Sequence, residues 1–196
     1  ADDEDLFQRV RVNFRRYGRR ACDFGACRAG DLAYMRAGGL DIEPIAFIGS
    51  DRGRTQFVTR KGLHTKDLKN RKIACDLQTV NLYFLAGELK KAGLKLSDVQ
   101  LIDQLDMNNP RPFVAGEVAA IVIDLPGAKR CLKAGRIAGT SASSPIDHVL
   151  FVKSWVKKQQ PELIQKFLAG YQQAQTSMRN PANEPKLAKI IDQHYY

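Results

Sequence analysis

Residues 72–93 read KIACDLQTVNLYFLAGELKKAG. The run Lys72–Cys75 is short and largely apolar, which predicts a buried strand. Leucines and an alanine then recur at helical spacing from Val80 to Ala92, and Gly93 follows where a helix would end. A strand joined by a short loop to an amphipathic helix is the building unit of α/β folds, so this stretch predicts that class.

The same alternation continues on both sides of this unit. The apolar run Val118–Ile123 has no polar residue, which is expected of a strand covered on both sheet faces. No tight hairpin signal separates the strands, and this favours mainly parallel sheets with crossover helices. The other predicted strands are a short one ending near Phe24, Ile45–Ile48, Gln56–Arg60, Val99–Ile102 and His148–Val152. The other predicted helices are Leu32–Ala37, Thr65–Leu68, Pro112–Ala115, Ala128–Leu132, Pro161–Met178 and Glu184–Ile191.

The composition is that of an ordinary globular protein, with 44% hydrophobic and 27% charged residues among 196. This length is enough for one domain or two small ones. The longest apolar run, Val118–Ile123, is far shorter than the roughly 18 residues of a membrane helix.

The net charge is +10, which raises the expectation of an anionic partner. Much of the charge lies near the amino terminus, in arginines at positions 9, 11, 15, 16, 19, 20 and 28. Three interpretations stay open: a solvated basic face, a phosphate-contacting patch, and a surface that meets another protein. The sequence carries no nucleic-acid-binding motif, and we expect no nucleic-acid partner.

Signs of catalysis, cofactors and metal are weak. The cysteines Cys22, Cys27, Cys75 and Cys131 form no CxxC pair and the three histidines are scattered, so no metal site is assigned. The serine-rich loop at 141–144 precedes Asp147 and His148, but neighbouring side chains point apart and no GxSxG elbow exists. Neither a P-loop nor a dinucleotide fingerprint occurs, and no two carboxylates can be placed as an acid/base pair. We therefore assign no catalytic residue and expect no cofactor.

The loop and helix start at Gln78, Thr79, Val80 and Asn81 form the main candidate site. They follow the carboxyl end of the strand Lys72–Cys75, where ligands bind in open α/β sheets. Free backbone N–H groups and the helix dipole favour an anion there. The alternative is that Thr79 simply caps the helix.

A second candidate is the polar loop Gly49–Arg54 after the strand Ile45–Ile48. Its Ser50 and Arg52 can present a hydroxyl and a guanidinium to an anion. The alternative is an ordinary surface turn.

Six segments occur in the order found in one known family. Through these six segments, the sequence resembles the SsuA/NMT1-like substrate-binding proteins of ABC importers, which have the type II periplasmic binding fold. The similarity spans about residues 21 to 190. The segments are Asp23–Gly25, Phe57–Gly62, Asp67–Ala74, Leu85–Val99, Phe113–Val118 and Pro161–Leu168.

The resemblance implies two lobes joined by two crossover strands, near Phe57–Arg60 and His148–Val152. Lobe one would hold residues 1–61 and 146–196, and lobe two residues 62–145. Ligand would bind between them, near Thr79, Val80 and Asn81, with Asp124 and Asp147 as further cleft residues. The family's first βα unit is largely absent before Asp23. A lobe lacking it is expected to expose an apolar patch, through which two copies can dimerise.

The resemblance implies a solute-binding protein, not an enzyme, that captures a small polar or anionic ligand such as a sulfonate or nitrate for an ABC permease. It implies a periplasmic or lipid-anchored extracellular location. Two alternatives stay open: an enzyme on the same fold acting on a small aromatic or pyrimidine-type substrate, and the effector-sensing domain of a transcription regulator.

Overall fold

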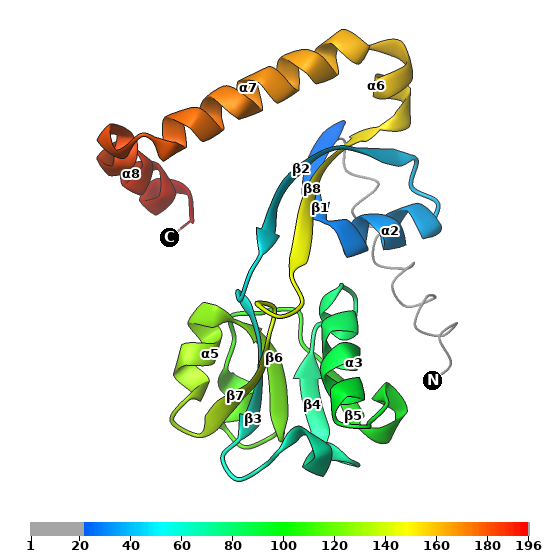
Figure 1. Ribbon diagram of the computed structural model, residues 1–196, viewed down its shortest axis with the longest axis vertical. Helices are drawn as coiled ribbons and strands as arrows, with labels where there is room; N and C mark the ends of the chain where they lie inside the picture. Colours follow the sequence, from blue (N-terminus) through cyan, green and yellow to red (C-terminus); the bar gives the residue numbers. More distant parts are fainter. Residues whose placement is uncertain (1–21, 196) are drawn as a thin grey trace.

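The computed structural model describes residues 22–195, apart from the side chains at 191, 194 and 195. Figure 1 shows two sheets, one above the other, and a helical arm that extends from the upper one. The arginines at positions 9 to 20 lie outside the described residues. The prediction that the family's first βα unit is largely absent also concerns residues 1–21, which lie outside the described part.

The upper sheet has three strands in the order β1-β8-β2, and both pairings are antiparallel. With helix α2 it forms what we call the three-stranded unit. Its elements are β1 (Phe24–Arg28), α2 (Ala29–Ala37), β2 (Ile42–Asp51) and β8 (Ile146–Lys153).

The lower sheet has five strands in the order β5-β4-β6-β3-β7, and with its helices it forms the five-stranded unit. Its strands are β3 (Thr55–Arg60), β4 (Lys72–Cys75), β5 (Gln100–Asp103), β6 (Ala120–Asp124) and β7 (Gly135–Thr140). Its helices are α3 (Asn81–Lys91), α4 (Arg111–Val114) and α5 (Leu125–Cys131), with 3-10 turns at Thr65–Leu68 and Leu96–Asp98.

The α/β class and the two-sheet architecture are confirmed, but strand direction differs from the expectation of mainly parallel sheets. Among the described residues, parallel pairing is confined to β4 with β5 and with β6. The chain passes from the upper to the lower sheet through β2 and β3 and returns through β7 and β8, so these long strands run against their neighbours. The predicted elements omitted β7 and α6 (Ser154–Gln159).

The core of the five-stranded unit lies on both faces of its sheet, as the period of two along a strand requires. Phe57 of β3 and Val122 of β6 pack on the face that α3 covers, with Leu85 and Leu89. Val58 and Ile121, their neighbours in sequence, pack on the opposite face against Ala128 of α5 and Phe113. Figure 1 shows α3 and α5 on opposite sides of the sheet. The continuous apolar run predicted at 118–123 is therefore explained by burial on both faces.

The three-stranded unit has a much smaller core, in which Leu32 and Met35 of α2 pack on Ile42 of β2. The chain then continues into α6, α7 (Pro161–Arg179), a 3-10 turn at Pro181–Asn183 and α8 (Glu184–Tyr195). Phe167 of α7 stacks on Phe24 of β1 with 4.4 Å between ring centroids. No residue of α7 is fully buried. None of the described helices is both long and apolar enough to cross a membrane.

By strand pairing, the chain crosses between the two units at 52–54 and 141–145. The lobe boundaries predicted at 61/62 and 145/146 stay a prediction, because pairing assigns β3 to the five-stranded sheet without defining rigid lobes. The predicted loop at Gly49–Gly53 is shorter than expected, since Gly49 and Ser50 still pair with His148 and Asp147.

Candidate functional site

The carboxyl edge of the parallel strands carries three aspartates. Asp76 follows β4, Asp103 ends β5 and Asp124 ends β6, so all three stand at the same edge of the sheet. This is the edge at which ligands bind in open α/β sheets. Helix α3 begins here, after the loop at 76–80, as the sequence predicted.

The loop that leads into α3 is held by these aspartates. Asp76 Oδ1 accepts a hydrogen bond from the Gln78 backbone N–H at 3.0 Å, and Asp103 Oδ2 accepts one from Gln78 Nε2 at 3.1 Å. Burial raises the pKa of the Asp76 carboxyl above its ordinary value, although hydrogen bonds from Gln78 and Thr79 oppose the shift. Gln78 therefore braces the loop with both its backbone and its side chain.

The N-cap of α3 is Val80, so Thr79, the cap in the alternative interpretation, lies one residue before the N-cap position. Its Oγ1 accepts a long hydrogen bond from the Asn81 backbone N–H, at 3.4 Å, and its carbonyl accepts one from Leu82 N at 3.1 Å. These contacts satisfy two of the N–H groups that a helix start leaves without an intrahelical partner.

Another donor at this end, the Val80 backbone N–H, bonds to a carboxylate from the other unit. Asp31, in the first turn of α2, accepts from Val80 N at 2.8 Å through Oδ1. Its other oxygen, Oδ2, accepts from Arg28 Nε, also at 2.8 Å. Arg28 Nη1 in turn donates to Asn81 Oδ1 at 2.8 Å. We call these four residues, Arg28, Asp31, Val80 and Asn81, the α2–α3 clasp.

The clasp lies largely out of solvent. Asp31 is 7% exposed and Asn81 is fully buried. Because Arg28 can only donate, the Asn81 oxygen must face it, and this fixes the amide orientation. Asn81 Nδ2 then has no hydrogen-bond partner among the described residues. An unpaired buried donor is uncommon and is a place to look for a water or a ligand.

The other predicted site residues lie near the two crossings between the sheets. Ser50 Oγ donates to Asp147 Oδ1 at 2.5 Å across β2 and β8. Asp124 accepts from Arg54 Nε at 3.0 Å. Arg52 has an exposed side chain. The structure thus groups Gln78, Thr79, Val80 and Asn81 at α3, pairs Ser50 with Asp147, and pairs Asp124 with an arginine that the sequence interpretation did not select.

Sequence reasoning also missed Arg28 and Asp31 as site residues. Their i, i+3 spacing at the start of a helix predicts an ion pair, and an aspartate in a first turn normally interacts with its own helix. Nothing in the local sequence indicates that Asp31 would bond to a second helix 49 positions away.

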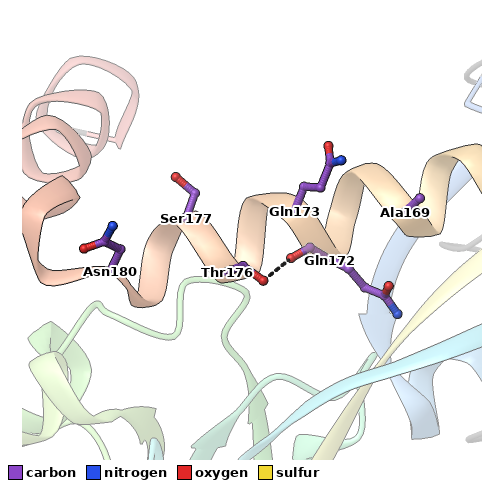
Figure 2. Close-up of a pocket in the computed structure, with 6 residues that line it drawn as sticks. All are labelled: Ala169, Gln172, Gln173, Thr176, Ser177 and Asn180. Carbon is purple, nitrogen blue, oxygen red and sulfur yellow. Dashed lines mark hydrogen bonds between the residues drawn. The ribbon is translucent and has the colours of Figure 1, made fainter.

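Two hollows lie elsewhere in the described part of the chain. One, of about 600 Å³, runs along α7, and its described lining comes from that helix and its C-cap residue Asn180 (Figure 2). A ligand site normally draws polar groups from several elements, so this hollow is a poor candidate. The other, of about 320 Å³, lies among Arg60, Arg71, Lys72 and Glu117, at the amino end of β4. There Arg60 already donates to the carbonyls of Phe113 and Val118.

Comparison with known proteins places this geometry in a family. The family model described as NMT1/THI5 like matches residues 17–184. The chain belongs to the NMT1/THI5-like family. This confirms the resemblance read from the six sequence segments. No curated protein sequence matches the chain.

Three of the solved structures similar to this NMT1/THI5-like chain are described as sulfonate-binding proteins. The periplasmic aliphatic sulphonate binding protein SsuA from Escherichia coli superposes with a TM-score of 0.72 at 18% identity, over 93% of this chain and 65% of that one. SsuA from Methylobacillus flagellatus KT, a putative sulfonate ABC transporter component, gives 0.69 at 16%, over 93% and 56%. The alkanesulfonate-binding protein SsuA from Xanthomonas axonopodis pv. citri, bound to MOPS, gives 0.65 at 17%, over 95% and 63%.

At these identities the likeness establishes the type II periplasmic binding fold and no more. The chain spans between 56% and 65% of the length of these three proteins.

Proposed function

We propose that this protein is a solute-binding component of an ABC importer, which captures a small polar or anionic ligand between its two sheet units. The observation that carries the proposal is the polar clasp at the carboxyl edge of the parallel strands, where α2 of one unit meets α3 of the other. Two crossings of the chain join the units, and such a pair of connections allows hinge closure around a ligand.

The hydrogen-bond donors at the start of α3 are suited to bind a ligand group rich in acceptors, such as a sulfonate, nitrate or a polar carbonyl. Arg28 supplies a guanidinium, Val80 a backbone N–H at a helix start, and Asn81 an unpaired amide N–H. Charged hydrogen bonds of this kind are shorter and stronger than neutral ones. Asp76 and Asp103, which stand on the same edge, can accept from donor groups elsewhere on the ligand. We place Ser50, Arg52, Asp124 and Asp147 at the rim of the same cleft.

The proposed partner is an ABC permease in a membrane, and the proposed location is periplasmic or lipid-anchored extracellular. The predicted homodimer also stays a proposal. Its support is a set of exposed apolar side chains on α7 and α8: Leu163 is 39% exposed, Met178 52% and Ile190 43%.

Native mass spectrometry of freshly purified protein is the first test, because a tight binder keeps its ligand. Calorimetric titration with ethanesulfonate, nitrate and a pyrimidine then compares the parent with Thr79→Ala and Asn81→Ala. We expect Asn81→Ala to weaken binding about ten- to a hundredfold, the equivalent of one charged hydrogen bond of about 1.5–3 kcal/mol. Asn108→Ala is the matched control, since Asn108 is exposed and only its backbone takes part in hydrogen bonds.

Unchanged affinity in Asn81→Ala would place the site elsewhere. The enzyme alternative is tested on the same samples: consumption of a bound pyrimidine or sulfonate during incubation would overturn the proposal of a non-catalytic binder. The regulator alternative predicts that the full-length protein carries a DNA-binding domain.

A further inference from the structure

The α2–α3 clasp is a continuous chain of hydrogen bonds between the two units. Val80 N–H donates to Asp31, Arg28 donates to the same carboxylate, and Arg28 also donates to Asn81, each at 2.8 Å. Apart from the crossing segments, this is where a helix of the three-stranded unit meets a helix of the five-stranded unit. In Figure 1 the start of α3 lies directly below α2.

Close approach of the two helices depends on Gly30. A Cβ at this position would stand 2.7 Å from Val80 Cγ2, well inside van der Waals contact. In the sequence, Gly30 lies between the clasp residues Arg28, which precedes α2, and Asp31, in the first turn of α2. The local backbone is therefore suited to bring Asp31 against the start of α3.

The clasp has more donors than acceptors. Val80 N–H, the Arg28 guanidinium and Asn81 Nδ2 all belong to it, and they come from both units. The Asp31 carboxylate serves the first two, and Asn81 Nδ2 is left buried and unpaired. A bound group with three acceptor oxygens can serve all three donors, whereas the carboxylate serves two.

We propose that Asp31 is an internal competitor of the ligand: its carboxylate occupies the α3 start in the ligand-free protein and gives way to an oxyanion when the ligand binds. This inference rests on the proposed function, because it assumes that the α3 start is the ligand site. Exchange of one anion for another keeps Arg28 paired throughout. Without ligand, the same carboxylate holds the two units together.

The test is calorimetric titration of the full chain with methanesulfonate, comparing the parent, Asp31→Ala and Asp31→Asn. We expect Asp31→Ala to bind about ten- to a hundredfold more tightly than the parent, which is the range for removal of one competing charged hydrogen bond. Asp31→Asn keeps the side-chain shape and an acceptor oxygen, so its affinity should lie between the two. Asp41→Ala is the control for loss of one negative charge, because Asp41 is exposed and uses only its backbone in the described contacts.

Hydrogen exchange at the Val80 amide gives a second readout that a purely structural Asp31 would not produce. In Asp31→Ala without ligand, exchange at Val80 should accelerate at least about tenfold, since the amide has lost its acceptor. Saturating methanesulfonate should restore the protection. Exchange that stays fast in the presence of the anion overturns the proposal, even if Asp31→Ala is well folded.

The two proposals fail in different ways. If the parent binds methanesulfonate and Asp31→Ala binds it no better, the internal competitor is refuted and the solute-binding function stands. If neither protein binds the anion, the internal competitor is again refuted, and the binding of neutral solutes by the parent decides the function separately. If Asp41→Ala binds methanesulfonate as tightly as Asp31→Ala does, the gain in affinity comes from the change in net charge. That result would refute the proposed exchange of the Asp31 carboxylate for the ligand.

Discussion

Ser141 ties together the two segments by which the chain crosses between the sheets. Its side chain is fully buried, and its Oγ accepts hydrogen bonds from the backbone N–H groups of Gly53 at 3.0 Å and Thr55 at 3.1 Å. The same hydroxyl donates to Asp51 Oδ1 at 3.1 Å. Three groups at residues 51–55, within and beside one crossing, thus converge on a single side chain of the other crossing.

We predict that Ser141→Ala destabilises the protein by about 2–4 kcal/mol. Thr55 is 1% exposed, so its N–H would be left unsatisfied at a cost of about 1–3 kcal/mol. Gly53 is partly exposed and water can replace the lost bond, which limits its share to about 0.5–1.5 kcal/mol. Asp51 Oδ1 still accepts from Arg54 N at 2.6 Å, so its loss is smaller.

Ser143→Ala is the matched control, because Ser143 lies in the same loop and its exposed hydroxyl donates only to the Thr140 carbonyl. Its effect should stay within about 0.5 kcal/mol. Urea unfolding followed by circular dichroism measures both, and the Ser141→Ala midpoint should fall by about 1–2 M with an unchanged slope. Equal midpoints for the two variants would refute the reasoning that this hydroxyl holds the crossings together.

Two further predictions concern ionisable groups. Burial raises the pKa of Cys27 to about 11 and also raises the pKa of Cys75 and Cys131. At about pH 8 the Cys27 thiolate is then about a thousandth of the thiol. Iodoacetamide at this pH should therefore label the exposed Cys22 first. Equal labelling of Cys27 and Cys22 in a peptide-mapping mass experiment contradicts this. Burial also raises the pKa of Asp76, so the folded protein binds that proton more tightly than the unfolded chain, and stability is lost as pH rises from the unfolded to the folded pKa. The side chain of Asp76→Asn stays neutral at every pH, so the stability of this variant relative to the parent should increase between about pH 3 and pH 7.

Local sequence was sufficient to locate most of the elements. The strand Lys72–Cys75 and the helix that follows it lie where the pattern predicted, because burial of one helix face and both strand faces leaves a periodic record in the chain. Strand β7 was missed because Gly135 and Gly139 interrupt its apolar pattern, and it lies at the edge of the sheet where less burial is required.

The direction of strand pairing could not be derived in the same way. Nothing in the residues of β3 indicates that it lies antiparallel to β6 on one side and to β7 on the other. The paired residues are 60 or more positions apart in the sequence. Their pairing depends on the assembly of the whole sheet and on the packing of α3 and α5 on its two faces.

The sequence by itself determined the α/β class, the family and the position of the α3 start, together with the polar residues Gln78, Thr79 and Asn81 beside it. Only the tertiary structure decided which group bonds to that helix start. It is the Asp31 carboxylate of α2, which also accepts a hydrogen bond from Arg28, and the lack of a side chain at Gly30 allows the close approach. The physical reason is range. Periodicity and capping depend on residues that are close together in the sequence. The contact between Asp31 and Val80 forms only when the two units, joined by two crossings, have folded against each other.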